Sequence, residues 1–419
     1  MMRLDKKLLG MAALAAIVGL LTVLPVLAAD TVKIGIMYSL TGPGSSIGTL
    51  QEEGAKLAIK DLNDRGGITL GGKKVKVEGI FRDDETKPQV AIQRLYEMSK
   101  DQGVTLLVGS TFGHINMALN NEIKKTGQYY LSTNGAPETF FQKAVKAPFA
   151  LNMTATSESA GAAAAIFMAK KLNAKKIACF MPDYVIGKTT FAGFEQAAKT
   201  LPNLKYQVFW VPVNTTDMTP YFIKVKEYGP DLVFIGSWAN DAISALKTFA
   251  EMGLGKNMKA LHFWLMNVFA TGIPPEAMEG IYGQMWWYWD MGGFKDAEVV
   301  KASKAFSEKY IKTYNAPPDP YAMNAYFGVI ETARGIELAG STDPEKVYNA
   351  LMQKPEFFTV KGPVHWRKDG RAVYKYATYM IKGKGSAGRK GMFKNYDYAQ
   401  ILDAYGGTEF LPSLESEGY

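Results

Sequence analysis

The chain has 419 residues, of which 47% are hydrophobic and 21% charged, and its formal net charge is +8. This length and apolar content predict a folded protein of two or three domains and exclude a disordered or collagen-like chain. Because the Lys and Arg residues are scattered singly along the chain, without interleaved aromatic clusters, the positive charge predicts a solvated surface and no nucleic-acid partner.

Residues 1–28 are predicted to be a secretory signal peptide. Basic residues at positions 3, 6 and 7 precede an uncharged apolar stretch from Leu8 to Leu24, which Pro25 ends. The following Val-Leu-Ala sequence fits a cleavage site, so we expect cleavage near Ala28 or Ala29. The alternative is a retained membrane anchor, because the apolar stretch approaches the length of a membrane span. No cysteine stands at the cleavage site, which argues against a lipid anchor.

The next part of the chain alternates short β-like runs with amphipathic helical windows. Strands are expected at Val32–Tyr38, Val75–Phe81, Thr105–Gly109 and Tyr129–Ser132, and helices at Gln51–Asp64, Pro88–Gln102 and His114–Thr126. Glycines directly after these windows, such as Gly103 and Gly127, are helix stop signals. Short buried strands that alternate with helices predict βαβ units and a parallel sheet.

The same alternation then restarts. Helices are expected at Glu158–Leu172, Gly187–Lys199, Pro220–Tyr228 and Asn240–Met252, and strands at Lys176–Met181, Tyr206–Val211, Leu232–Gly236 and Lys259–Leu265. Further helices are expected at Ala297–Tyr314 and Pro320–Ala339, and strand-like runs at Phe358–Trp366 and Val373–Ile381. Two such series predict an α/β fold with two doubly wound parallel-sheet lobes. Ligands of such sheets bind beyond the carboxyl ends of the strands.

Motifs typical of enzymes are incomplete in this chain. The Gly187–Thr189 sequence resembles the end of a phosphate-binding loop, but Pro182 stands where the first glycine is required. The three histidines lie far apart and lack the spacing of metal ligands. Cys179, the only cysteine, has apolar neighbours and is predicted to be a small core residue. We therefore expect no catalysis, no cofactor and no bound metal.

Several short motifs, taken in order, resemble those of a known family. They are Ile34-Gly35-Ile36, Leu40-Thr41-Gly42-Pro43, Gly54-Ala55, Asp61–Ile68, Asp83-Asp84 followed by Pro88, Val108-Gly109, Tyr184–Gly187 and Gly362-Pro363. No single motif is specific, but their order and spacing resemble the branched-chain amino-acid type of periplasmic solute-binding protein, with the type I or Venus flytrap fold. The resemblance covers essentially the whole chain after residue 28.

The resemblance implies two lobes joined by three crossover strands, with a ligand between them that hinge closure traps. The first lobe would take residues 29–151 and 285–361, and the second would take residues 152–284 and 362–419. The family also implies a monomer in the periplasm that delivers a small organic ligand to the membrane permease of an ABC importer. Two other classes, a sensory ligand-binding module and an enzyme, remain as alternatives.

The ligand pocket departs from the pattern of the amino-acid-binding relatives. In those relatives, a serine and a threonine of two first-lobe loops hold the ligand carboxylate, and the matching positions here are Gly113 and Ala136. A glutamate that balances the ligand ammonium is also missing, because Leu261–Val268 contains no acid. Since a buried ammonium without a counter-charge is strongly disfavoured, the pocket predicts an apolar or aromatic carboxylate or amide. A branched-chain or aromatic amino acid is the alternative ligand.

The candidate ligand-binding residues follow the strand ends. They are Ser46, Ile47, Phe112, Gly113, His114, Asn134, Gly135, Ala136, Tyr184, Trp238 and Trp264. We expect His114, Asn134 and the N–H groups of Gly113 and Gly135 to hold the polar end of the ligand, and the aromatic residues to stack on its body. His114 has an alternative as a solvent-facing helix residue, and Trp264 as a core residue. For Trp286–Trp289, hinge packing and cleft lining both remain open.

Overall fold

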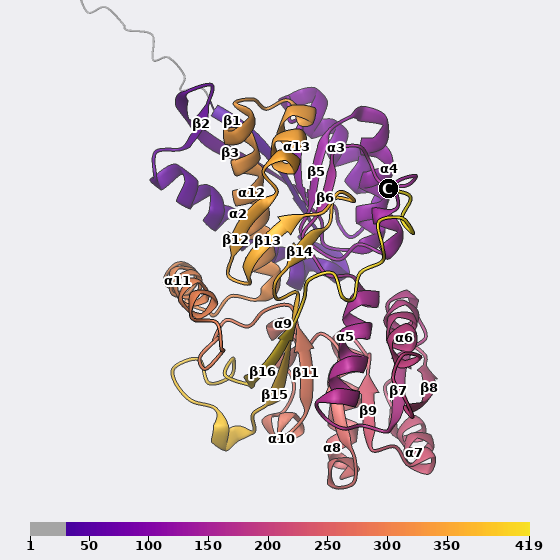
Figure 1. Ribbon diagram of the computed structural model, residues 1–419. Helices are drawn as coiled ribbons and strands as arrows, with labels where there is room; N and C mark the ends of the chain where they lie inside the picture. Colours follow the sequence, from indigo (N-terminus) through magenta and orange to yellow (C-terminus); the bar gives the residue numbers. More distant parts are fainter. Residues whose placement is uncertain (1–30) are drawn as a thin grey trace, which may run out of the picture.

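The computed structural model describes residues 31–419 and has two α/β lobes stacked end to end (Figure 1). The sheet of the first lobe has the strand order β2-β3-β1-β4-β5-β6. Its strands are β1 (Thr31–Tyr38), β2 (Ile68–Leu70), β3 (Lys73–Asp83), β4 (Leu106–Gly109), β5 (Tyr129–Ser132) and β6 (Ala150–Asn152). All neighbours are parallel except β2 and β3.

Helices cover both faces of the first sheet, which explains why its strands are apolar on both sides. They are α2 (Ser45–Asp64), α3 (Pro88–Gln102) and α4 (Gly113–Thr126) from the first part of the chain, with α12 (Pro320–Ala339) and α13 (Pro344–Gln353) from a later part. Alternate residues of β1 point to opposite faces: Ile34 and Ile36 pack towards α2 and α12, and Met37 packs towards α3 and α4. Short 3-10 turns lie at Gly42–Gly44 and Glu138–Phe141.

A small antiparallel sheet also packs on the core of the first lobe. It comprises β12 (Glu356–Thr359), β13 (Gly362–Trp366) and β14 (Ala372–Tyr374). The run expected as one strand, Phe358–Trp366, is therefore a hairpin, whose turn ends at Gly362 with φ of 87°. Trp366 joins the first-lobe core and donates a hydrogen bond to Glu331 of α12 (2.7 Å). The lobe boundary expected between residues 361 and 362 thus falls inside this hairpin.

The sheet of the second lobe has the strand order β16-β15-β11-β10-β9-β7-β8. Its strands are β7 (Lys176–Pro182), β8 (Lys205–Val211), β9 (Leu232–Ile235), β10 (Lys259–His262), β11 (Tyr282–Met285), β15 (Thr378–Gly383) and β16 (Ala399–Tyr405). The five strands from β7 to β11 are parallel to their neighbours, and β15 and β16 are antiparallel. The expected α/β fold with two parallel-dominated lobes is confirmed.

The helices of the second lobe are α5 (Ser157–Lys170), α6 (Val185–Ala198), α7 (Thr219–Tyr228), α8 (Ala239–Glu251), α9 (Asn267–Ala270) and α10 (Pro275–Met278), with 3-10 turns at Leu254–Lys256 and Ser386–Gly388. Cys179 is fully buried in the core on β7, as a small core residue would be. Helix α11 (Ala297–Tyr314) lies beside the junction of the lobes and ties to α2 through an ion pair between Lys309 and Asp61 (2.5 Å).

The described chain passes between the lobes four times. Three passages link β6 to α5, β11 to α11 and α12, and β14 to β15; they correspond to the expected crossovers. The fourth is the segment 406–419, which leaves β16 and returns to the first lobe beside α4 (Figure 1). Arg367 donates to the Pro412 carbonyl (2.8 Å), and the Lys143 N–H donates to the Glu417 carbonyl (2.9 Å), so this return is bonded to the first lobe.

No helix within residues 31–419 has the length and apolar character of a membrane span. The expected signal peptide and its cleavage site near Ala28 lie outside the described residues.

Candidate ligand-binding site

Three tryptophans stand in a row where neighbouring strands of the second sheet end. Trp238 follows β9, Trp264 follows β10 and Trp286 directly follows β11. These strands are parallel neighbours, with His262 of β10 paired to Ile235 of β9 and to Gly283 of β11. Since parallel strands end at the same edge of a sheet, the three tryptophans follow neighbouring strand ends at the edge that faces the first lobe.

The tryptophan row packs against aromatic residues of the first lobe. Trp264 and Trp286 meet edge to face with ring centroids 5.0 Å apart, and Trp286 meets Tyr321 of α12 in the same way at 5.1 Å. Burial raises the pKa of the Tyr321 hydroxyl, and the Trp238 side chain acts on that hydroxyl in the opposite direction. The Trp238 ring centroid lies 6.0 Å from that of Phe112. Each edge-to-face pair contributes about 0.5–1.5 kcal/mol beyond burial. The rings therefore form a continuous aromatic contact between the lobes.

The first-lobe loop after β5 has most of its polar groups already paired. The Asn134 side chain donates to the Thr111 carbonyl and accepts from the Gly135 N–H (2.7 Å). Asn116 in turn donates to the Gly135 carbonyl (2.8 Å). Ala136 is buried in the core beneath the loop. The Asn134 amide and the Gly135 N–H, which we expected to hold the polar end of a ligand, bind each other in this conformation.

The other predicted residues are spread along the cleft. Phe112 and Gly113 are half-buried at the start of α4, and His114 is exposed there, with its ring stacked on Phe112 at 5.8 Å. Trp264 is 5% exposed and stacks on Phe263 at 4.3 Å, so it is both a core residue and a neighbour of the cleft. Tyr184 is 55% exposed before α6.

Ser46 is exposed in the first turn of α2, whereas Ile47 is buried in the apolar cluster that extends from the second lobe to α2 and α12. The structure therefore brings Phe112, His114 and Trp238 together and connects them to Trp264 through Trp286 and Tyr321.

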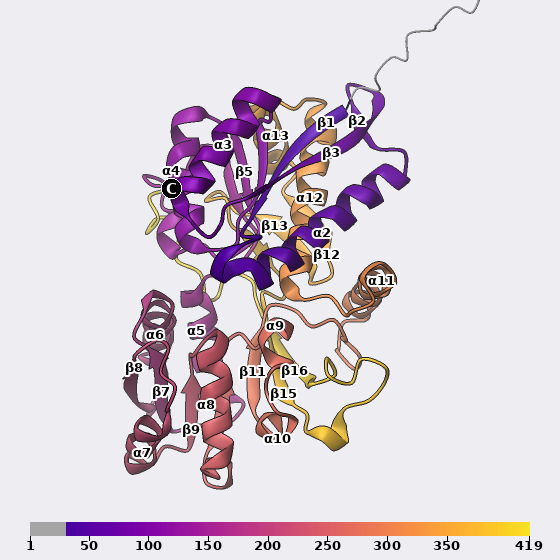
Figure 2. The same ribbon diagram turned by 180° about the vertical axis from the view of Figure 1, so that it is seen from behind.

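A cavity of about 460 Å³ lies between the lobes where the start of α2 faces α9. Figure 2 shows these two helices from behind. It is lined by Ser46, Thr49, Leu50, Glu53, Asn267, Val268, Thr271, Tyr310, Tyr314, Ala316, Pro317, Asp319 and Tyr396. Its volume is within the range of small-molecule sites, about 300–1,000 Å³. The lining contains two carboxylates and neither Lys nor Arg.

Asp319 reaches the second-lobe loop that was expected to lack an acid. Its carboxylate accepts from the Val268 N–H of α9 (2.9 Å) and from the Tyr321 N–H of α12 (3.0 Å), while Asn267 donates to the Pro318 carbonyl (2.9 Å). Burial raises the pKa of Asp319 to about 6, and the backbone N–H groups act in the opposite direction. The sequence predicted a helix from Pro320, but it did not indicate that Asp319 would have a partner in the other lobe.

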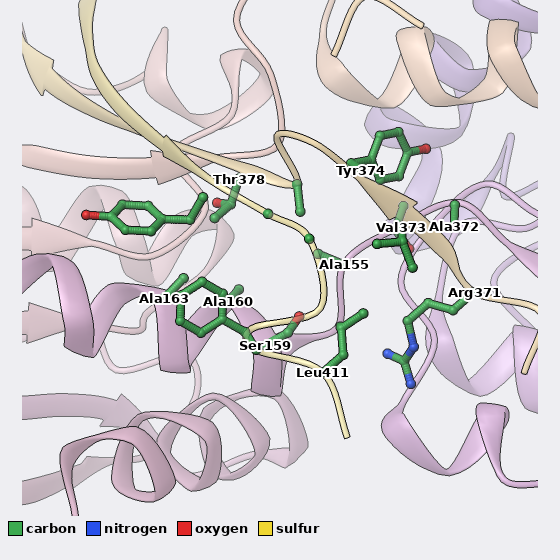
Figure 3. Close-up of a pocket in the computed structure, with 16 residues that line it drawn as sticks. Ala155, Ser159, Ala160, Ala163, Arg371, Ala372, Val373, Tyr374, Thr378 and Leu411 are labelled. Carbon is green, nitrogen blue, oxygen red and sulfur yellow. The ribbon is translucent and has the colours of Figure 1, made fainter. Parts of the chain in front are cut away.

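A second, much smaller pocket of about 20 Å³ lies at the hinge (Figure 3). The first turns of α5, with Ser159 and Ala160, line it together with residues 371–378 and 405–411. A space of this size holds no more than one water molecule. The pocket therefore belongs to the packing of the hinge, and the larger cavity between the lobes is the candidate ligand site.

Two lobes whose strand ends face each other across an aromatic interface define a hinged, two-lobe binding protein. The chain belongs to the periplasmic binding protein family, whose model matches residues 31–388. The resemblance to the branched-chain amino-acid type of ABC importer component is thereby confirmed, and family membership places the protein in the periplasm.

Known relatives and solved structures support this assignment. The chain is 24% identical to a leucine-, isoleucine-, valine-, threonine- and alanine-binding protein of Pseudomonas aeruginosa, over 78% of this chain and 83% of the relative. An amino acid ABC transporter substrate-binding protein from Pseudomonas fluorescens Pf-5 is similar in fold, with a TM-score of 0.80, 20% identity and coverage of 93% and 99%. A solute-binding protein from R. palustris in complex with benzoate has a TM-score of 0.73, 19% identity and coverage of 90% and 97%.

Proposed function

We propose that this protein captures an aromatic or otherwise apolar carboxylate or amide between its lobes and delivers it to the membrane permease of an ABC importer. The observation that carries the proposal is the row of Trp238, Trp264 and Trp286 at adjacent strand ends, facing Phe112 and Tyr321. Such flat, apolar surfaces suit stacking on an aromatic body. The fold itself accepts ligands of this kind, since the R. palustris neighbour holds benzoate.

The loop substitutions favour the same ligand class. Gly113 and Ala136 offer no hydroxyl to an amino-acid carboxylate, and Leu261–Val268 offers no acid of its own to an ammonium. Desolvation of an unpaired ammonium costs several kcal/mol, so a ligand without one binds this cleft more readily.

An amino acid is the second candidate ligand, and one observation favours it. The 460 Å³ cavity is lined by Glu53 and Asp319, whose carboxylates are the counter-charge that an ammonium requires. Both carboxylates already accept hydrogen bonds, Glu53 from the Tyr310 hydroxyl and Asp319 from two backbone N–H groups. The Pseudomonas aeruginosa relative is named as a leucine-, isoleucine-, valine-, threonine- and alanine-binding protein, which is a further reason to test amino acids as ligands.

Isothermal titration separates the two candidates. Benzoate, 4-hydroxybenzoate and benzamide are compared with leucine, isoleucine and valine at one pH and one salt concentration. We expect micromolar or tighter binding of at least one aromatic acid or amide. Tight binding of leucine, isoleucine or valine, with no heat from the aromatic compounds, would overturn the proposed ligand class. Saturating ligand at 100 times its Kd should also add about 2.7 kcal/mol to the free energy of unfolding.

Capture by hinge closure is part of the same proposal. The ligand must contact the second lobe strongly enough to exceed the free-energy difference between the open and closed forms, which is a few kcal/mol in such systems. Small-angle scattering with and without saturating ligand should show a smaller radius of gyration with ligand. An unchanged radius would contradict closure.

The remaining steps follow from the transport role. The protein acts without catalysis, as a monomer, after cleavage of the signal peptide near Ala28 or Ala29. Mass spectrometry of protein taken from the periplasm of the native cell tests the cleavage, and an intact N-terminus in the membrane fraction would contradict it.

A further inference from the structure

Several buried side chains near the junction of the lobes hold polar atoms that have no hydrogen-bond partner among the described residues. Three of these side chains lie in or next to the aromatic contact between the lobes. Their unpaired atoms are the indole nitrogens of Trp264 and Trp286 and both polar atoms of the Asn324 side chain. Trp264 is 5% exposed, and Trp286 and Asn324 are each 1% exposed. An unpaired buried polar group costs about 1–3 kcal/mol, so three together point to a partner outside the chain.

The three side chains come from both lobes and are linked through Tyr321. Trp264 and Trp286 pack edge to face at the ends of the neighbouring strands β10 and β11. Trp286 packs in turn on Tyr321, and Asn324 lies one helical turn after Tyr321, on the same face of α12. That face looks towards the strand ends of the first sheet, because a Cβ at Gly328, one turn further, would lie 2.4 Å from Thr133 Cγ2.

The chemistry of this set specifies what it can bind. An indole N–H only donates, and the Asn324 carboxamide donates through Nδ2 and accepts through Oδ1. The set therefore offers more donors than acceptors and suits a carboxylate oxygen or an amide carbonyl. An ammonium group would meet two indole donors and one carbonyl acceptor, which is an unfavourable match.

We propose that Trp264 Nε1, Trp286 Nε1 and the Asn324 amide bind the carboxylate or carbonyl end of the ligand. This inference rests on the proposed function and adds the orientation of the ligand. The aromatic body then extends along the chain of rings towards Trp238 and Phe112. The polar end is thus held at the second-lobe strand ends and α12, instead of by the loop of Asn134 and Gly135, whose groups bind each other.

The variants Trp286→Phe, Trp264→Phe and Asn324→Leu each remove the donor and put an apolar side chain in its place. The matched control is Trp287→Phe, because Trp287 is equally buried but its Nε1 already donates to Ser303 (2.9 Å). The titrated probes are benzoate and benzamide. We expect the three site variants to weaken binding by roughly ten-fold to a hundred-fold, as for loss of a buried hydrogen bond to a charged group, and the control to retain wild-type affinity.

Failure of this inference and failure of the proposed function give different results. If the wild type binds neither aromatic probe and binds leucine, the proposed function is wrong and the inference fails with it. If the wild type binds benzoate and the site variants bind it equally well, the inference alone is wrong.

A stability measurement without ligand gives a second readout. Trp286→Phe removes an unpaired donor, whereas Trp287→Phe removes the same atoms together with a formed hydrogen bond. Trp286→Phe should therefore lower the urea midpoint less than Trp287→Phe. An equal or larger loss for Trp286→Phe would show that its N–H is already satisfied within the protein and would overturn the inference.

Discussion

Phe112 at the start of α4 and Trp238 at the start of α8 pack edge to face across the junction of the lobes, with ring centroids 6.0 Å apart. Each ring follows the end of a parallel strand in its own lobe, β4 for Phe112 and β9 for Trp238. Trp238 also packs on Phe269 at 5.3 Å, so its position is fixed from the second-lobe side as well. The pair places one aromatic surface of each lobe where a bound ligand would touch both.

Substitution Trp238→Ala should weaken binding of the aromatic ligand. Loss of one stacking surface costs about 1–3 kcal/mol, which corresponds to roughly ten-fold to a hundred-fold in Kd or somewhat more. Titration of benzoate and 4-hydroxybenzoate measures the change. Trp210→Ala is the matched control, since Trp210 lies in the edge strand β8, which β7 separates from β9, and packs on Phe191 of α6. Equal losses for the two variants would mean that Trp238 has no direct role.

Asp319 should make stability depend on pH between about 4 and 6. Because burial raises its pKa from 3.8 to about 6, the folded protein binds more protons than the unfolded chain in this range. The contribution of Asp319 to the free energy of unfolding therefore falls as the pH rises from about 4 to 6, by up to about 3 kcal/mol. The ionisable neighbours that interact with the Asp319 carboxylate are Tyr310, Tyr321 and Tyr398. These tyrosines do not titrate between about pH 4 and 6, so they do not add to the change.

Urea unfolding of the wild type and Asp319→Asn at several pH values tests this dependence. The asparagine keeps one acceptor oxygen but cannot titrate, so the difference in stability between the two proteins should change by the stated amount across the range. A difference that is independent of pH would show that Asp319 is ionised throughout.

Arg371→Met should destabilise the protein strongly. Arg371 is 1% exposed and forms ion pairs with Glu138, with Asp369 (3.3 Å) and with Glu417 (2.9 Å). Removal of Arg371 leaves the Glu138 carboxylate without an ion-pair partner, whereas Asp369 and Glu417 keep Arg367. Removal of one partner from a buried ion-pair network costs about 3–5 kcal/mol. Urea unfolding measures the loss. Lys304→Met is the control, because it breaks an exposed ion pair with Glu308. Its loss in free energy of unfolding should stay below about 1 kcal/mol. Similar losses in the two variants would contradict the expectation.

Lys361 should make stability rise with pH above 7. The residue is buried, and its ammonium donates to the Ala377 carbonyl (2.9 Å) and lies 3.9 Å from the centre of the Tyr374 ring. Burial lowers its pKa from 10.5 to about 7, so between these values the folded protein binds fewer protons than the unfolded chain. Stability should therefore increase with pH by about 1 kcal/mol per pH unit from this group. Comparison of wild type and Lys361→Met at pH 7 and pH 9 measures it, and parallel pH profiles would refute it.

The helices were predictable from sequence because their ends carry local signals. Helix α12 begins at Pro320 after the capping Asp319 and ends before Gly340 with φ of 58°, and the expected range Pro320–Ala339 was correct. The strands after residue 355 were less predictable. The Val373–Ile381 run breaks between β14 and β15 because the chain there changes lobes, and tertiary packing overrides the local preference.

Part of the candidate site could also be predicted. Phe112, Trp238 and Trp264 follow strand ends. Because ligands of such sheets bind beyond the strand ends, the position of these three residues in the sequence is enough to predict that they lie near the cleft. Asn324 and Tyr321 escaped prediction because α12 is buried on nearly all sides, so no apolar stripe indicates which face meets the cleft. The pairing of Asn134 with Gly135 depends on loop geometry that no periodic pattern reveals.

The return of segment 406–419 to the first lobe affects how this protein could serve as an optical sensor. Residue 31 begins a first-lobe strand, and the Tyr419 ring lies 6.0 Å from Lys143 Nζ of the same lobe. Fluorescent proteins attached at these two positions would therefore move together and report little of hinge closure. A reporter inserted at the exposed turn of Gly229, between α7 and β9, would move with the second lobe, and its distance to a label at residue 419 would change when the cleft closes.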